Sequence, residues 1–339
     1  MRFGYWIGNG HTWDDILAAG IRAEETSWDG LWFADHFMPF QGDVGGPIHE
    51  AWSVLSGLAV ATDRVRLGPL VAGNTYRHPA VLAKQAVAAD HISHGRVVLG
   101  IGSGWQENEH VAYGLEFGTF TDRFERLEES LQIIRSLRDN DRTTFAGQHY
   151  QLDDAPLEPK PIGKLPILIG GGGEKKTLRM VADYADEWNV WSTPEIMAQK
   201  AAVLDAHCTK IDRDPASIQR SAVALLFLCD TAQKSASMRE NPMPRPSLIG
   251  TVSELRDQIA AFADAGVDEV IIPDFTLGQG AALNEILDQF ITGRGRLPVA
   301  GQRHASLRRY RACVRLPHEP RRLVARRSHP NQVSARGHL

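Results

Sequence analysis

A histidine stands where a buried apolar run of the sequence ends. Residues 29–40 read DGLWFADHFMPF, and Asp35 and His36 follow the apolar part directly. An imidazole has an unperturbed pKa close to neutrality, so it can take or give a proton beside a reacting centre. The other interpretation is that His36 only hydrogen-bonds a neighbouring loop.

Four consecutive glycines, Gly170 to Gly173, follow the apolar run LPILI and precede a helical pattern. Backbone N–H groups in such a loop, at the start of a helix, form a site for an anion, and phosphate is its usual occupant. We therefore predict phosphate binding at these glycines. Tight packing of the helix against the strand is the alternative.

Two further segments combine glycines with polar side chains. Residues 67–79 (LGPLVAGNTYRHP) leave a strand through small residues, and Asn74 is placed to donate to a ligand; a simple turn before a helix starting at Pro79 is the alternative. Residues 100–110 (GIGSGWQENEH) superficially resemble a dinucleotide fingerprint, but Glu107 replaces its last glycine. This weakens a Rossmann interpretation and favours the lip of a pocket.

Apolar runs typical of strands alternate with helical patterns along the chain. The predicted strands are 2–6, 30–34, 65–70, 96–101, 165–169, 187–190, 221–228 and 269–272. The predicted helices are 14–26, 48–61, 79–91, 124–137, 176–184, 194–209, 253–265 and 281–291. Eight alternating units predict a parallel α/β (β/α)8 TIM barrel, with a doubly wound sheet as the alternative. In either fold the polar segments gather at the carboxyl ends of the strands.

Long connections interrupt this alternation at 102–122, 140–164 and 234–248, which we expect to be loop insertions. The third contains three prolines and is either a mobile lid or a surface loop.

The composition is that of an ordinary soluble globular protein, with 339 residues, 43% hydrophobic and 23% charged residues and a net charge of −4. No apolar stretch is long enough to span a membrane, and the N-terminus resembles a strand rather than a signal peptide, so we expect a cytoplasmic protein. Three cysteines without paired spacing suggest neither a disulfide framework nor a zinc site, and no other metal-binding pattern is present.

The last segment, 293–339, differs from the barrel predicted for 1–292. It contains twelve arginines, no lysine and one acidic residue, Glu319. It lacks a sustained period, so we expect a disordered extension. Translation of a GC-rich gene in the wrong frame would give similar sequence, and a basic arm for nucleic acid is the functional alternative.

Taken together, FADHF, VRLGPLV with RHP, LGIGSGW with NEH and AYG, and PILIGGGG with DEWNVW resemble the bacterial luciferase-like family of flavin and deazaflavin oxidoreductases. The pattern is most similar to the class that uses coenzyme F420, and it extends over residues 1–292. The resemblance implies a (β/α)8 barrel with the cofactor at its carboxyl end and the cofactor phosphate over Gly171, Gly172 and Gly173.

The same resemblance implies roles for other residues. His36 is expected to contact the cofactor and act as the catalytic proton carrier, with Glu109 assisting. Leu70 and Val71 are expected to form a non-proline cis peptide behind the cofactor ring. Asn108 is expected near the cofactor phosphate or side chain, and Asn74 is grouped with the cofactor-binding residues.

Tryptophans at strand ends are candidates for the substrate pocket, namely Trp6, Trp105 and Trp191, although any one of them could instead belong to the core. The glucose-6-phosphate dehydrogenases of the family have a Glu where this chain has Trp105. This departure disfavours sugar phosphates and suggests a more apolar substrate.

The expected activity is hydride transfer between coenzyme F420 and a small organic substrate. An FMN-dependent monooxygenase, using reduced FMN and oxygen, is the first alternative. A non-catalytic ligand-binding barrel with a nucleic-acid-binding tail is another, although we do not favour nucleic acid as a partner. Barrels of this family often pair, so a homodimer is also expected, and no membrane partner is.

Overall fold

The computed structural model describes residues 1–40, 42–241 and 243–293. Its main sheet is parallel throughout and has nine strands. In spatial order they are β3 (Arg66–Pro69), β2 (Gly30–Phe33), β1 (Arg2–Ile7), β13 (Glu269–Pro273), β10 (Gln219–Val223), β9 (Glu187–Trp191), β8 (Ile167–Gly170), β5 (Leu99–Gly102) and β4 (Ala72–Gly73).

The first and last members of this order are two halves of one strand. β3 and β4 are separated only by Leu70 and Val71, whose peptide bond is cis, as the resemblance predicted. β4 pairs with β5, and a bridge from Leu67 to Val97 joins β3 to the residues just before β5. The sheet is therefore a barrel of eight staves, which confirms the predicted (β/α)8 fold.

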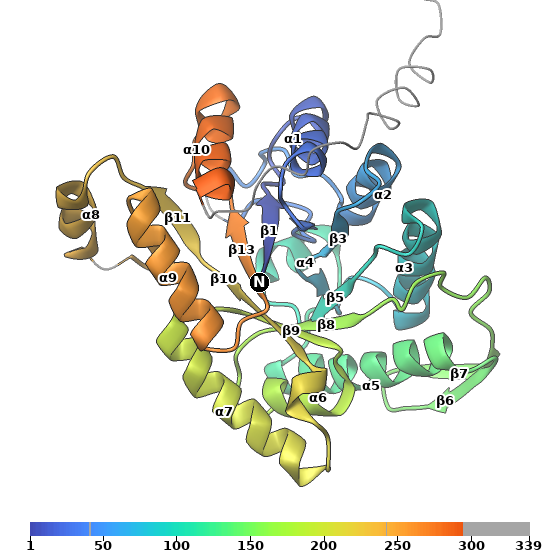
Figure 1. Ribbon diagram of the computed structural model, residues 1–339. Helices are drawn as coiled ribbons and strands as arrows, with labels where there is room; N and C mark the ends of the chain where they lie inside the picture. The colour runs from blue at the N-terminus through green and yellow to red at the C-terminus, as the bar shows by residue number, and fades with distance from the viewer. Residues whose placement is uncertain (41, 242, 294–339) are drawn as a thin grey trace, which may run out of the picture. The chain divides into compact units, whose positions relative to one another are not determined.

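Helices cover the outside of the barrel (Figure 1). They are α1 (Trp13–Glu25), α2 (Ala51–Ala61), α3 (Pro79–Ser93), α5 (Phe120–Asp139), α6 (Thr177–Tyr184), α7 (Pro194–Lys210), α9 (Val252–Asp264) and α10 (Gly280–Gly293). The larger apolar core lies between helices and strands, and a second, smaller one fills the barrel interior with side chains such as Trp32, Leu168 and Ile271. This filled interior leaves the carboxyl end of the barrel as the place for a ligand.

The connections contain more regular structure than their polar composition indicated. The segment 102–122 includes α4 (Glu107–Tyr113), and 140–164 includes a hairpin of β6 (Thr143–Ala146) and β7 (Gln151–Ala155).

The predicted strand 221–228 is in fact two strands, β10 and β11 (Leu225–Leu228), because the chain leaves the barrel at Ala224 and β11 pairs with β12 (Ser247–Gly250). The segment 234–248 begins inside α8 (Ala232–Arg239), so the expectation of an irregular segment there is wrong for its first residues.

The predictions for the arginine-rich segment fall on 294–339, outside the described residues. Among the described residues, no helix is long and apolar enough to cross a membrane, and no cluster of metal-ligating side chains is present. Cys208 and Cys229 are buried free thiols.

One arginine side chain donates hydrogen bonds to the C-terminal ends of two helices. Arg96 donates to the carbonyl oxygens of Ala59 (2.9 Å), Val65 (2.6 Å) and Ser93 (2.7 Å), and also to both oxygens of Thr62. Burial, which disfavours the charge, lowers the pKa of this guanidinium. Arg96 thus satisfies carbonyls that the ends of α2 and α3 leave free.

Replacing Arg96 with Met is expected to lower the free energy of unfolding by about 2–4 kcal/mol, because several buried carbonyls lose their donor. Urea unfolding of the variant measures this. Arg142→Met is the matched control, since the side chain of Arg142 is 59% exposed. Equal stability of the two variants would contradict the role assigned to Arg96.

Candidate active site

A cavity of about 1130 Å³ opens at the carboxyl ends of the barrel strands. Residues from the ends of seven staves line it, because parallel strands place the loops that follow them at one rim. Eight of the predicted site residues are among its lining: His36, Leu70, Val71, Gly171, Gly172, Trp6, Trp105 and Trp191. The other four, Glu109, Asn74, Asn108 and Gly173, are not among the lining residues.

His36 is held by a buried carboxylate. Its Nδ1 lies 2.8 Å from Oε1 of Glu109, which is on α4 and completely buried. A carboxylate only accepts hydrogen bonds, so the ring proton of neutral His36 sits on Nδ1 and leaves the Nε2 lone pair free. The side chain is 22% exposed and its ring borders the cavity, so Nε2 is the atom available to a ligand.

Glu109 lies beside His36 but is not among the residues that line the cavity. Its carboxylate also accepts from the Phe37 amide (2.7 Å) and from the Tyr76 hydroxyl. Burial raises the pKa of Glu109, but the hydrogen bonds from His36, Phe37 and Tyr76 outweigh burial and hold the pKa below its ordinary value. For Tyr76, burial first and then the Glu109 carboxylate raise the pKa, so its hydroxyl stays protonated. The pair of Glu109 and Tyr76 therefore carries one negative charge, on the Glu109 carboxylate beside His36.

This lowered pKa predicts how acid affects the fold. Ionised Glu109 stabilises the protein above its unfolded pKa, about 4.5, and this stabilisation is lost as the pH falls through the lower folded pKa. Glu109→Gln should therefore lose stability at neutral pH and show a smaller further loss below pH ~4.5 than the wild type.

Urea unfolding between about pH 7 and pH 3 measures this difference. Glu107→Gln is the control, because Glu107 is exposed on the same helix. Parallel pH profiles for wild type and Glu109→Gln would contradict the assignment.

The residues between β3 and β4, Leu70 and Val71, explain why several neighbouring positions are glycine. A Cβ on Gly170 would lie 3.0 Å from Val71 Cγ1, one on Gly102 would lie 2.8 Å from Val71 Cγ2, and one on Gly100 only 2.1 Å from the Pro69 carbonyl. Gly100 and Gly102 on β5, together with Gly170 on β8, therefore leave room for the residues between β3 and β4. The GIG motif at 100–102 thus serves packing. This agrees with the absence of the last glycine of a dinucleotide fingerprint.

The glycine loop after β8 has only part of its backbone free. The Gly171 amide donates to the Asn189 carbonyl at 2.9 Å, whereas the amides of Gly172 and Gly173 have no acceptor within the described residues. A Cβ on Gly172 would meet Val190 Cγ2 at 3.0 Å. The predicted phosphate site at Gly171 to Gly173 is thus reduced to two free amides, of which Gly172 borders the cavity.

The two asparagines point elsewhere. Asn74 is buried and accepts from the Ser130 hydroxyl at 2.6 Å, which ties β4 to α5. Asn108 donates to the Pro39 carbonyl at 3.4 Å. Their contacts with a cofactor therefore stay predictions.

Aromatic rings form two walls of the cavity. The Trp6 ring centroid lies 5.9 Å from that of Trp191 and 5.1 Å from that of Phe275. Trp105 packs edge to face against His36 at 5.4 Å and is 52% exposed. The walls suit a planar ring or an apolar substrate beside His36.

His11, Asp274 and Arg245 are among the cavity residues that the sequence reasoning missed. His11 and Asp274 come from opposite ends of the chain and meet only because β1 pairs with β13. Arg245 lies in the segment expected to be a lid or a loop, and its guanidinium lies 4.7 Å above the Trp191 ring.

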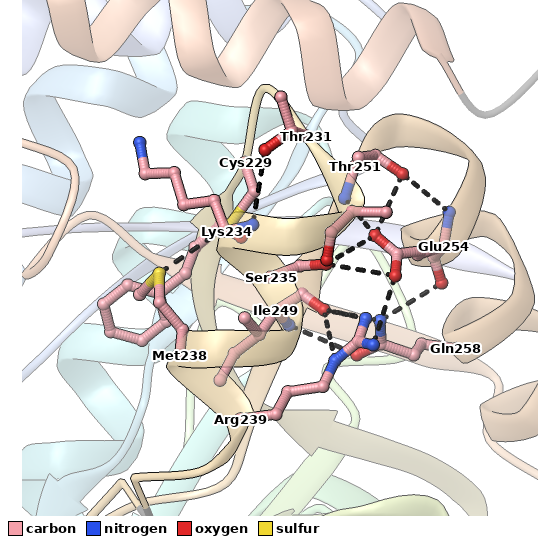
Figure 2. Close-up of polar contacts among 12 residues, drawn as sticks. Cys229, Thr231, Lys234, Ser235, Met238, Arg239, Ile249, Thr251, Glu254 and Gln258 are labelled. Carbon is pink, nitrogen blue, oxygen red and sulfur yellow. Dashed lines mark hydrogen bonds and ion pairs between the residues drawn. The ribbon is translucent and has the colours of Figure 1, made fainter.

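Figure 2 shows how the part of the chain that precedes Arg245 is anchored. The Ser235 hydroxyl on α8 lies 3.0 and 2.9 Å from the two carboxylate oxygens of Glu254 on α9, and Arg239 donates to the Ile249 carbonyl and to Glu254. Hydrogen bonds from the Thr251 backbone and from Ser235 lower the pKa of Glu254 to about 2. α8 is therefore tied to β12 and α9.

The fold and the cavity define a (β/α)8 barrel with an aromatic-walled cavity and a carboxylate-backed histidine at its carboxyl end. The chain belongs to the luciferase-like monooxygenase family, whose sequence profile matches residues 1–243. It is similar to an F420-dependent glucose-6-phosphate dehydrogenase of Amycolatopsis mediterranei (strain U-32), with 37% identity over 174 residues. That match covers 50% of each protein, so the chain spans about half the length of this curated relative.

Solved structures share the fold. An F420-dependent secondary alcohol dehydrogenase in complex with an F420–acetone adduct is similar with a TM-score of 0.75 and 19% identity, over 87% of this chain and all of that one. The coenzyme F420-dependent tetrahydromethanopterin reductase of Methanopyrus kandleri gives a TM-score of 0.72 and 16% identity, over 87% of this chain and 99% of that one. These likenesses concern the fold.

Proposed function

We propose that this protein is an F420-dependent oxidoreductase that transfers a hydride between the deazaflavin coenzyme and a small, largely apolar alcohol or ketone. The observation that carries the proposal is His36, fixed by buried Glu109 and facing a cavity that Leu70, Val71 and the glycine loop border. The F420-dependent activity named for the Amycolatopsis relative supports the choice of cofactor.

The cavity fits such a cofactor. Its volume of about 1130 Å³ exceeds the ~300–1,000 Å³ typical of small-ligand pockets, so a ring system and a substrate have room together. The lack of a side chain at Gly172 leaves space against Val190, and the free amides of Gly172 and Gly173 suit a phosphate. Leu70 and Val71 offer an apolar surface for a ring.

When bound, coenzyme F420 accepts or supplies a hydride at carbon 5 of its deazaflavin ring. His36 Nε2 takes the hydroxyl proton of an alcohol as its C–H bond breaks, and the imidazolium so formed is stabilised by the Glu109 carboxylate. In the reverse direction the imidazolium returns that proton to the ketone oxygen. The aromatic walls exclude water and hold the reacting carbon in place.

The side chains around His36 also indicate how polar the substrate is. Trp105 packs against the histidine, and its indole together with the Phe40 ring (4.7 Å) makes this edge of the cavity apolar. We therefore propose a substrate less polar than a sugar phosphate.

An anaerobic assay tests the proposal: the purified protein is mixed with F420 and a panel of secondary alcohols, and the deazaflavin absorbance is followed. Loss of the oxidised F420 spectrum in the absence of oxygen is the expected result. Reaction only with reduced FMN and oxygen, with consumption of oxygen, would overturn it and favour the monooxygenase activity after which the family is named.

A further inference from the structure

A second histidine in the cavity is backed by a second buried carboxylate. Asp274 directly follows β13 and is 4% exposed. Its Oδ2 accepts from the Tyr5 hydroxyl (2.9 Å) and the Gly8 amide (3.1 Å), and lies 3.1 Å from His11 Nε2. Three donors on one oxygen fix this carboxylate and hold the imidazole in one orientation.

This arrangement repeats the construction of the His36 site. In both pairs a buried carboxylate binds one ring nitrogen and accepts from a backbone amide and a tyrosine hydroxyl, Tyr76 for Glu109 and Tyr5 for Asp274. The reaction proposed above needs one proton carrier and uses only His36. His11 is therefore oriented by a buried carboxylate although it has no role in that step.

The free atom of His11 is Nδ1. Its Nε2 carries the proton that faces Asp274, and Nδ1 has no hydrogen-bond partner among the residues that the structure describes. The ring borders the cavity, and its side chain is 18% exposed. Hydrogen bonding to Asp274 raises the pKa of His11 against the effect of burial, and the charges of Asp274 and Asp15 add to this. Nδ1 can thus donate to an oxygen atom as well as accept from one.

The surroundings of His11 restrict what reaches it. Trp6 and Phe275, from the same two strand ends, pack at 5.1 Å, and Trp191 extends this wall from β9. A ligand that meets Nδ1 therefore has an apolar body beside the rings and an oxygen at the histidine.

Building on the proposed function, we infer that His11, oriented by Asp274, binds a second oxygen function of the substrate. The substrate is then an apolar alcohol, or the corresponding ketone, that carries a further hydroxyl or carbonyl group at a distance from the reacting carbon. His36 handles the proton of the reacting group, and His11 selects compounds that have the second group.

A series of matched probes tests this inference. Cyclohexanol is compared with cyclohexane-1,2-diol, 1,3-diol and 1,4-diol as substrates with F420, for wild type, His11→Phe and His11→Asn. In the wild type at least one diol should exceed cyclohexanol in kcat/KM by about tenfold or more, because a site built to bind a hydroxyl discriminates against its absence. His11→Phe should abolish this preference, so that the diols and cyclohexanol are turned over with similar kcat/KM. His11→Asn, whose amide reaches the place of Nδ1, should retain part of it.

A binding measurement separates this inference from the proposed function. In protein with ¹⁵N-labelled histidine and no cofactor, the preferred diol should shift the His11 Nδ1 resonance far more than cyclohexanol does. Absence of any diol preference both in this shift and in turnover would overturn the inference, as would an equal loss of all four probes in His11→Phe. Failure of F420 to bind or react would instead overturn the proposed function, while the resonance comparison still decides the role of His11.

Discussion

Replacing His36 with Asn is expected to lower kcat for F420-dependent alcohol oxidation by about 10²–10⁴-fold, the usual contribution of a positioned general base. Asn cannot take the hydroxyl proton, and the negative charge of Glu109 loses the imidazolium that it stabilises. The Kd for F420 should change far less, because ring and phosphate contacts come from Leu70, Val71 and the glycine loop. Steady-state kinetics and a cofactor titration on the same preparation measure both effects.

His94→Asn is the matched control for this substitution. His94 is exposed and has a φ of 57°, a left-handed conformation that Asn adopts readily, so its replacement should leave kcat unchanged. Wild-type kcat in His36→Asn would remove His36 from the mechanism. An equal loss in both variants would mean that the effect is not specific to the site.

Replacing Gly172 with Asp is expected to weaken F420 binding by about 100-fold, equivalent to about 2.7 kcal/mol. The new carboxylate would stand beside the amides expected to hold the cofactor phosphate and would repel it. A deazaflavin riboside, which lacks the phosphate, should bind wild type and variant with nearly equal Kd. Fluorescence titration of both compounds gives this double comparison.

Gln151→Glu controls for the added charge, because Gln151 is exposed on β7. It should bind F420 as the wild type does. If Gly172→Asp weakens the riboside as much as F420, the loop does not hold the phosphate and the substitution acts through the shape of the cavity.

Local patterns were enough to predict the barrel and the rim at which the site lies. The runs around Trp32, Leu168 and Ile271 are apolar because they are buried on both sides, and each ends in glycines or polar residues. The family resemblance added the cis bond at Leu70, which no periodicity could indicate.

What sequence reasoning missed depends on contacts between distant residues. His11 and Asp274 are 263 positions apart, and nothing near either residue shows that they meet. α4 has only seven residues, several of them polar, so its pattern was too short to identify as a helix. Its Glu109 was predicted to be catalytic, and α4 places this carboxylate fully buried at 2.8 Å from His36 Nδ1, a contact that the local pattern did not show.

The most direct test of the central claim is a titration of the purified protein, both as residues 1–339 and ending at Thr292, with F420 and with FMN. Three of the eight tryptophans, Trp6, Trp105 and Trp191, border the cavity, so intrinsic fluorescence should report binding. We expect quenching at micromolar F420, much weaker binding of FMN, and the same result for both lengths of chain. Preference for FMN, or binding of neither compound, would contradict the central claim.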